Sequence, residues 1–465
     1  MTSIAERNLD ALRGALRGTV LTEGDPDYDQ ARSVWNGEID RRPAVIARCA
    51  GPEDVVAALA YAREQGLEVA VRGGGHNFGG MAVCDRGLVV DLTPLKSVTV
   101  DPDTRVVRCG AGLTWADLDA ATQQHGLAVP GGTVSHTGIS GLTLGGGMGW
   151  LTGAFGLSCD NLSSAQVVTA DGRILRAAAD EHPDLFWALR GGGGNFGVVT
   201  EFEFRAHPVG PLVRVGLFFW GAADGVPALR LARRIVSGLG EDSGALIAGL
   251  NAPPAPFVPD EYHFAPGYAL IVAGFGGEDA HASIADNVRE GLTPLFEMVT
   301  EMPYVELQKL IDGAAPWGIL AYEKGAYVDD LSEDVIAVIT EHLPRRTSPM
   351  SIMPILPMQG AYTTVPEEAT AFGGSRRGGY VVNMAGLATD PAVHAAEREW
   401  ARTFWAALAP HASNSAGYVN FMNEQDHDRV RASYGAEKYE RLSRIKAEYD
   451  PENVFHRNAN IRPAQ

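Results

Sequence analysis

The chain has 465 residues, of which 45% are hydrophobic and 20% are charged, and its formal net charge is -19. Such a chain is expected to fold into two or three packing units with a large apolar core. The negative charge disfavours nucleic acid and anionic membranes as partners, and no apolar run is long enough to cross a membrane, so neither partner is expected.

The four cysteines, Cys49, Cys84, Cys109 and Cys159, are scattered, and neither CxxC nor HExxH spacing occurs. This usage predicts no disulfide framework and no metal site. Residues 1–20 mix charged and apolar side chains without the apolar centre of a secretory signal, so a cytoplasmic protein is expected.

The first half of the chain alternates short strands with glycine-rich loops. Pro52-Glu53-Asp54 predicts the start of a helix that Gly66 ends, because proline and acidic residues favour the first turn. A second helix is expected over 115–125, and Asp171-Gly172 predicts a hairpin turn. Strands are expected over 67–71, 88–92, 97–100, 104–109, 164–170, 173–177 and 198–205.

Longer elements follow the composition change at Pro208-Val209-Gly210-Pro211. Strands are expected over 213–220, 245–249, 268–274 and 380–385, and helices over 228–237, 280–291, 332–342 and 392–407. This pattern predicts an α+β arrangement in which an antiparallel sheet is backed by helices. A short strand over 418–422 and a helix over 437–449, ended by Asp450-Pro451, complete the chain.

Glycine is dense over 73–80, 131–156 and 191–197. Such runs suit backbone that approaches a ligand closely, although tight turns in a β-rich domain explain any single run as well. Gly192-x-Gly194-x-x-Gly197 matches the dinucleotide fingerprint, but it leads into a strand and not a helix, which excludes a Rossmann site. Glycine loops between strands still bind phosphate through backbone N–H groups, which favours a long anionic cofactor.

His76 lies in one of these loops, between Gly75 and Asn77. A histidine there is a surface turn residue, a ligand, a base or a covalent attachment point. Spacing alone leaves these alternatives open.

Several motifs together resemble one family. Val71-Arg72-Gly73-Gly74-Gly75-His76-Asn77 looks like the attachment loop of FAD-linked oxidases of the vanillyl-alcohol-oxidase (PCMH-type) superfamily, in its berberine-bridge-enzyme-like branch. The resemblance continues through 141–150, 155–157, 160–161, 184–191, 195–200, 449–455 and 458–463. It implies an N-terminal segment (1–39), a PCMH-type FAD-binding domain (40–210), a substrate domain (211–415) and a berberine-bridge-like C-terminal segment (416–465) that completes the FAD site.

The resemblance also implies FAD held by a single 8α-histidyl bond to His76. Some members add a cysteinyl bond at the position of Val134, so no cysteinyl link is expected here. The residues implied at the cofactor are Arg72, Gly73, Gly74, Gly75, His76, Asn77, Thr137, Gly138, Ser140, Gly141, Gly145, Gly147, Asp160, Asn161, Val198, Val199, Asn420, Asn458 and Asn460.

By the same resemblance, the expected activity is that of an oxidase. A hydride passes from an alcohol or amine carbon of a small or aromatic metabolite to FAD and then to O₂, releasing H₂O₂. Thr137 occupies a position where the family often has a small aliphatic residue that gates oxygen. A flavin dehydrogenase or an oxidative cyclase therefore stays an alternative, as does a flavin-binding protein without turnover. Monomer and homo-oligomer both stay open.

The expected catalytic residues are Tyr418, Asn383 and Tyr380. Tyr418 resembles the start of the family's Tyr-x-Asn segment, and an aromatic core residue is the alternative. A phenol has a pKa of about 10, so it acts as a base only with help from a cation or from hydrogen bonds. Arg376 and Arg377 are candidates for that help, or else residues of a solvated turn.

Overall fold

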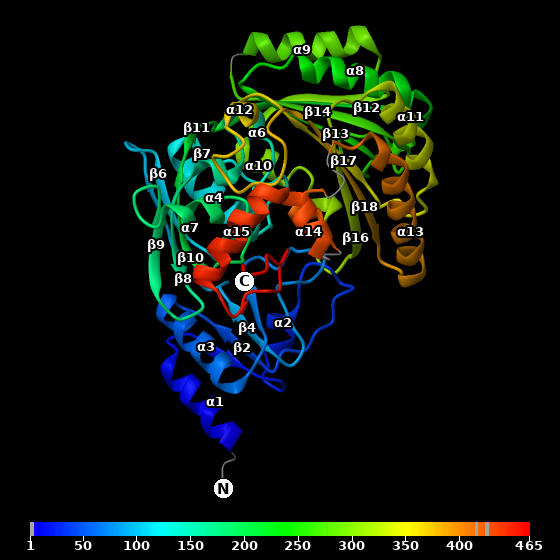
Figure 1. The fold of residues 1–465 in the computed structure, drawn as a ribbon. Helices are drawn as coiled ribbons and strands as arrows, with labels where there is room; N and C mark the ends of the chain where they lie inside the picture. The colour runs from blue at the N-terminus through cyan, green and yellow to red at the C-terminus, as the bar shows by residue number, and fades with distance from the viewer. Residues whose placement is uncertain (1–3, 277, 414–416, 424–426) are drawn as a thin grey trace.

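The computed structural model describes residues 4–276, 278–413, 417–423 and 427–465. It has an α+β fold in which two smaller sheets lie beside one large antiparallel sheet (Figure 1). The predicted domain boundary between residues 415 and 416 lies outside the described residues. Among those described, no helix is long and apolar enough to cross a bilayer.

Two sheets form the first half of the chain, and the expected strands are all present there. The four-stranded sheet has the order β1-β2-β4-β3, and β2, β4 and β3 run parallel. The five-stranded sheet has the antiparallel order β5-β6-β10-β8-β9 and includes the predicted hairpin. The strands are β1 (Thr19–Leu21), β2 (Val45–Arg48), β3 (Val69–Arg72), β4 (Leu88–Asp91), β5 (Val98–Asp101), β6 (Val106–Gly110), β8 (Leu162–Val168), β9 (Ile174–Ala178) and β10 (Val198–Arg205). A short pair, β7 (Leu127–Ala128) and β11 (His207–Pro208), lies beside them.

The helices of this half range from 4 residues in α6 to 14 residues in α3. The predicted helix α3 (Pro52–Gln65) ends at Gly66, which has a φ of 64°. The others are α1 (Ile4–Ala15), α2 (Tyr28–Arg32), α4 (Trp115–Thr122), α5 (Ile139–Gly145), α6 (Thr152–Phe155) and α7 (Pro183–Leu189). The helices α5 and α6 lie within the glycine-dense stretch 131–156, where no helix is predicted from the sequence.

The large sheet has seven strands in the order β15-β12-β14-β13-β17-β18-β16, all antiparallel. They are β12 (Leu212–Gly221), β13 (Ser243–Asn251), β14 (Pro266–Gly274), β15 (Phe296–Pro303), β16 (Leu320–Val328), β17 (Met353–Met358) and β18 (Gly379–Ala388). The helices α8 (Gly225–Ser237), α9 (Glu278–Gly291), α11 (Glu333–His342) and α13 (Pro391–Leu408) share one hydrophobic cluster with it, and α9 lies beside α8 (Figure 1). The short helices α10 (Tyr304–Lys309) and α12 (Ala361–Thr364) complete this part. The predicted sheet backed by helices is confirmed, and β15, β16 and β17 are additional strands.

The other face of this sheet packs on the first half of the chain. Val215, Leu356 and Val381 belong to the same hydrophobic cluster as Val199 and Leu144. The C-terminal helices α14 (His427–Tyr434) and α15 (Ala436–Tyr449) then return to the junction, where α15 contacts α7 (Figure 1). The two halves are therefore joined by the last part of the chain.

The strand predicted over 418–422 is wrong. Residues Val419–Phe421 form a turn of 3-10 helix, called η8, which follows Gly417 at a φ of 82°. The side chain of Asn420 donates to the carbonyl of Leu142 and to the hydroxyl of Tyr418, so this segment bonds through side chains and not as a strand.

Candidate functional site

Two glycine loops meet backbone to backbone at the centre of the first half. A Cβ atom added to Gly74 would lie 2.3 Å from the nitrogen of Gly138, and one added to Gly138 would lie 2.3 Å from the nitrogen of Gly74. Any other residue at either position would force the loops apart. The loop after β3 and the start of α5 therefore form one continuous surface of backbone.

The C-terminal segment closes on the far end of α5. A Cβ on Gly145 would lie 2.2 Å from the side-chain oxygen of Asn420. The backbone N–H of Gly147, a residue with a φ of 90°, donates to the Tyr418 hydroxyl over 2.8 Å. Thus α5, the Gly147 turn and η8 are held as one unit.

His76 lies in a pocket of aromatic rings built from three parts of the chain. Trp35 stacks on it with ring centroids 5.2 Å apart and planes 19° apart. Nε2 of His76 lies 2.7 Å from Nδ1 of His136. Trp317, from the loop before β16, meets the His76 ring edge-on at 5.9 Å. The surface turn considered for His76 is therefore not what the structure shows.

Burial, followed by the neighbouring His136, lowers the pKa of His76 to about 3. The imidazole is consequently neutral at physiological pH and keeps a lone pair on one nitrogen. That is the state required of a nucleophile or a ligand.

Four side chains near these loops carry buried polar atoms for which the described residues offer no partner. They are Nε of Arg72, Oγ1 of Thr143, and Oδ1 of both Asn458 and Asn460. Because buried polar groups are normally hydrogen-bonded, unpaired atoms beside a glycine cradle fit a polar ligand with several acceptors and donors. A dinucleotide cofactor satisfies this requirement.

The remaining residues expected at the cofactor fall into three groups. Val198 and Val199 begin β10 and are buried. Asn77 accepts a hydrogen bond from the Met81 backbone through its side chain, and the hydroxyl of Ser140 donates to the carbonyl of Ala111. The third group lies in or directly beside the glycine loops and consists of Gly73, Gly75, Thr137 and Gly141.

Asp160 and Asn161 are engaged by the protein itself. Arg376 pairs with both oxygens of Asp160, at 2.7 and 2.8 Å. Asn161 donates to two backbone carbonyls and accepts from His207. The buried Arg376 is therefore neither a solvated turn residue nor a partner of the Tyr418 hydroxyl, and Arg377 is exposed.

The middle of the large sheet supplies a second polar group facing the junction. Asn383 on β18 donates to Oε2 of Glu323 on β16 over 2.8 Å. Oε1 of Glu323 and Oδ1 of Asn383 have no partner within the described part of the chain. Burial raises the pKa of Glu323 well above its usual range, which favours the protonated acid.

Tyr380 does not join this group. It belongs to the cluster on the helix-covered face of the sheet, together with Val382 and Met384, whereas Asn383 points the other way. Because side chains alternate along a strand, Tyr380 and Asn383 cannot face the same site. The expectation that both act together is therefore corrected.

Tyr418 is fully buried, and its hydroxyl accepts hydrogen bonds from Gly147 and Asn420. Burial nevertheless raises its pKa, and the nearby Glu323 acts in the same direction. The neutral phenol is therefore favoured, and little of Tyr418 is in the phenolate form that could accept a proton.

Sequence reasoning missed Glu323, His136 and Trp35. An acidic residue inside the apolar run Ile319–Val328 was the available signal for Glu323, because charged residues are rarely buried without a role. His136 lies just before Thr137 and Gly138, two residues that the resemblance places at the cofactor, and this position was the available signal for it. Nothing in the sequence indicates that Trp35 stacks on His76.

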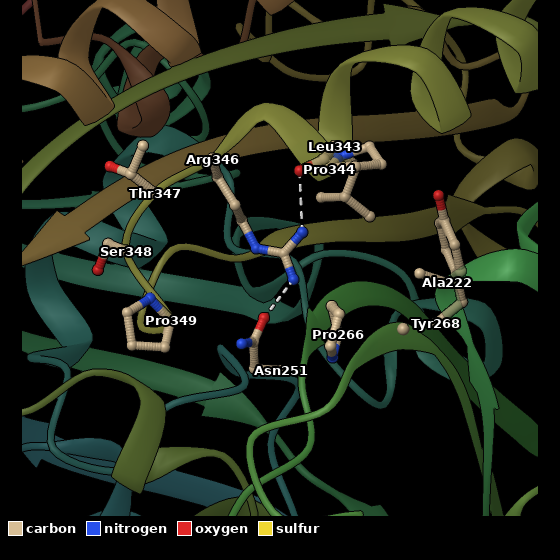
Figure 2. Close-up of a pocket in the computed structure, with 11 residues that line it drawn as sticks. Ala222, Asn251, Pro266, Tyr268, Leu343, Pro344, Arg346, Thr347, Ser348 and Pro349 are labelled. Carbon is tan, nitrogen blue, oxygen red and sulfur yellow. Dashed lines mark hydrogen bonds between the residues drawn. The ribbon is translucent and has the colours of Figure 1, made fainter.

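A separate cavity of about 240 Å³ lies at one end of the large sheet (Figure 2). Arg346 projects into it and donates to the side chain of Asn251 and the carbonyl of Leu343. None of the lining residues is one expected at the functional site.

Comparison with known proteins matches both ends of the chain to family models. Residues 43–178 match an FAD binding domain, and residues 417–462 match the berberine and berberine-like model. These two regions contain the glycine loops with His76, and the η8 segment with Asn458 and Asn460.

Whole-length relatives agree. The chain is 31% identical to (R)-6-hydroxynicotine oxidase of Paenarthrobacter nicotinovorans, covering 97% of each protein. It is 30% identical to an uncharacterised FAD-linked oxidoreductase of Bacillus subtilis, covering 96% of this chain and 97% of that protein. The crystal structure of 6-hydroxy-D-nicotine oxidase from Arthrobacter nicotinovorans superposes with a TM-score of 0.84 at 28% identity, covering 97% of this chain and 98% of the other. The chain is therefore an enzyme that belongs to the FAD-linked oxidoreductases of the berberine-bridge-enzyme-like branch.

Proposed function

We propose that this enzyme is an oxidase with FAD bound covalently through a single bond to His76. The observation that carries the proposal is the neutral, ring-enclosed imidazole of His76 beside the Gly74–Gly138 contact. A neutral imidazole has the lone pair needed to bond to the flavin methyl group, whereas a protonated one does not.

The residues proposed to hold FAD are the two glycine loops and the unpaired polar atoms around them. Arg72 and Thr143 would supply donors, and Asn458 and Asn460 would bring their unpaired amide oxygens from the C-terminal segment. Bound FAD supplies hydride acceptance. A second, cysteinyl bond is not proposed, because Val134 has no thiol and all four cysteines are free and buried.

On the substrate side we propose Glu323, Asn383 and Tyr418. Oxidation of an alcohol or amine carbon releases a proton from the neighbouring O–H or N–H group, and a side chain must accept it. Glu323 is a buried carboxyl that accepts a hydrogen bond from the Asn383 amide. Its raised pKa makes the ionised form a stronger base, and it would accept the substrate's proton in that form. Asn383 would orient it, and the Tyr418 hydroxyl would position the Gly147 turn.

The relatives suggest the substrate class. The 31%-identical relative is named an oxidase of (R)-6-hydroxynicotine, which favours a small aromatic amine or alcohol with O₂ as the acceptor. A flavin dehydrogenase or an oxidative cyclase is the alternative, because Thr137 occupies the proposed oxygen-gating position. We propose that the chain divides into an N-terminal segment (1–39), an FAD-binding domain (40–210), a substrate domain (211–415) and a C-terminal segment (416–465). A cytoplasmic location is proposed from the four unpaired cysteines.

Acid precipitation of the purified protein tests the covalent bond. Flavin fluorescence should stay with the denatured polypeptide in the wild type and be lost in His76→Ala. His207→Ala is a matched control, because His207 is another partly buried histidine of this half with a lowered pKa. Flavin that stays attached in His76→Ala would place the bond elsewhere. Oxygen uptake over a panel of aromatic amines and alcohols then tests the oxidase reaction.

A further inference from the structure

A second histidine contacts the proposed attachment residue. His76 Nε2 and His136 Nδ1 are 2.7 Å apart, and the two ring centroids are 4.8 Å apart. One of these nitrogens must donate and the other must accept, because a hydrogen bond has a single proton. The direction of the bond decides which nitrogen of His76 is free to react.

The surroundings of His136 set that direction. Burial lowers the pKa of His136, whereas Asp312 and a hydrogen bond from its ring to the Ala315 backbone raise it. A backbone group raises the pKa of a histidine when its carbonyl accepts the ring N–H, and Nδ1 of His136 already faces His76. A proton on Nε2 of His136, with Nδ1 as the acceptor, is the arrangement that satisfies both neighbours. His76 consequently donates from Nε2 and keeps its lone pair on Nδ1.

We propose that His136 is the proton acceptor that activates His76 for covalent attachment of FAD. This inference rests on the proposed attachment at His76. For Nδ1 of His76 to bond to the 8α-methyl carbon, one methyl C–H bond would break, its proton leaving to solvent and its electron pair passing to the flavin ring. The Nε2 proton of His76 passes to His136. The two protons and two electrons released amount to reduction of the flavin, and dioxygen then removes them as hydrogen peroxide.

The structure holds His136 in place for this role. Asp312 accepts hydrogen bonds from the backbone N–H and the hydroxyl of Ser135, the residue before His136. Trp35 stacks on the opposite partner, His76, and donates from its indole to the carbonyl of Ala315. Both imidazoles are thus fixed by the N-terminal segment, the glycine loops and the loop before β16.

The test separates FAD binding from bond formation. Full-length protein is produced in riboflavin-starved cells, FAD is added, and samples are taken over time. Fluorescence quenching reports FAD binding, and fluorescence of the denatured band reports the covalent bond. We expect His136→Ala to bind FAD with wild-type affinity but to form the bond about 10²–10⁴-fold more slowly, and imidazole in the buffer to restore part of the rate.

His136→Gln distinguishes proton transfer from mere orientation. Its amide oxygen accepts the hydrogen bond of His76 but takes no proton, so this variant should stay slow, and a wild-type rate would overturn the proposal. If His136 variants do not fold, Asp312→Asn should still attach FAD more slowly than the wild type, and an unchanged rate would count against the role of His136. A wild type that never retains flavin after denaturation would instead contradict the attachment at His76 itself.

Discussion

Glu323 and Glu397 are both completely buried in the half of the molecule built on the large sheet, yet their surroundings differ. Glu397 on α13 accepts four hydrogen bonds, from the Thr347 backbone and hydroxyl, the Ser348 backbone and the Ser351 hydroxyl. Within the described residues the Glu323 carboxyl accepts one, from Asn383. A buried carboxyl with a full set of donors ties a loop to a helix. One with a single amide partner, next to the Tyr418 segment, has capacity left for a ligand.

The largest expected effect is a difference in the rate of flavin reduction between variants of Glu323 and of Glu397. Glu323→Gln keeps the shape but cannot accept a proton, so anaerobic flavin reduction by a substrate found in the oxygen-uptake panel should slow by about 10²–10⁴-fold. Glu397→Gln should reduce at the wild-type rate. Stopped-flow absorbance of the flavin measures both, and equal slowing in the two variants would remove the distinction.

The free energy of unfolding should fall more when Glu397 is replaced than when Glu323 is replaced, the reverse of the order expected for flavin reduction. Glu397→Leu leaves several buried donors without an acceptor and should lower the free energy of unfolding by about 3–5 kcal/mol. Glu323→Leu leaves one amide donor unpaired, at a cost of about 1–3 kcal/mol. Urea midpoints compare the two, and a larger loss for Glu323→Leu would contradict the assignment of Glu397 as the structural residue.

Asp119 offers a third case for this comparison. It is buried, and among the described residues its carboxyl accepts from the Gln308 amide alone, but it lies at the α4–α10 contact, outside the candidate site. Burial raises its pKa to about 7. The unfolded value is about 3.9, so its stabilising contribution is complete below that pH and is lost as pH rises to about 7. Asp119→Asn should remove this loss, which amounts to up to about 4 kcal/mol.

Unfolding midpoints of Asp119→Asn and wild type at pH 4 and pH 8 measure this effect. The variant should gain on the wild type only at the higher pH, with unchanged flavin reduction. If Asp119→Asn lost activity, a buried carboxyl with few hydrogen-bond partners would not have to lie at the candidate site to matter for function, and the comparison would not identify Glu323.

The smallest effect is expected from Tyr418→Phe. It leaves the Gly147 N–H without its acceptor, which costs about 1–3 kcal/mol, and it should lower the thermal midpoint of the flavin-loaded protein. Its flavin reduction should slow less than that of Glu323→Gln, because burial favours the neutral phenol over the phenolate that could accept a proton. A larger slowing than in Glu323→Gln would make Tyr418 the base.

Much of the FAD-binding half could be predicted from the sequence, because the motifs there are contiguous. The glycine content of Gly73–Asn77 and of the segment from Gly138 onward is enough to predict that the backbone there approaches a ligand or another loop closely. The pairs His76–His136 and Glu323–Asn383 could not be predicted, because each joins residues 60 positions apart through the tertiary fold. The strand predicted at Tyr418 is wrong for a related reason. The hydrogen bonds of this segment are made by the side chains of Tyr418 and Asn420 with α5 and the Gly147 turn, which are distant in the sequence.

Mass spectrometry of the tryptic peptide Gly73–Arg86 tests the central claim most directly. This peptide contains His76 and Cys84, so fragmentation distinguishes the two candidate attachment atoms. The proposed structure of the holoenzyme predicts a peptide heavier by one flavin, with the added mass on His76. An unmodified peptide from protein that carries flavin, or a flavin on Cys84, would contradict it.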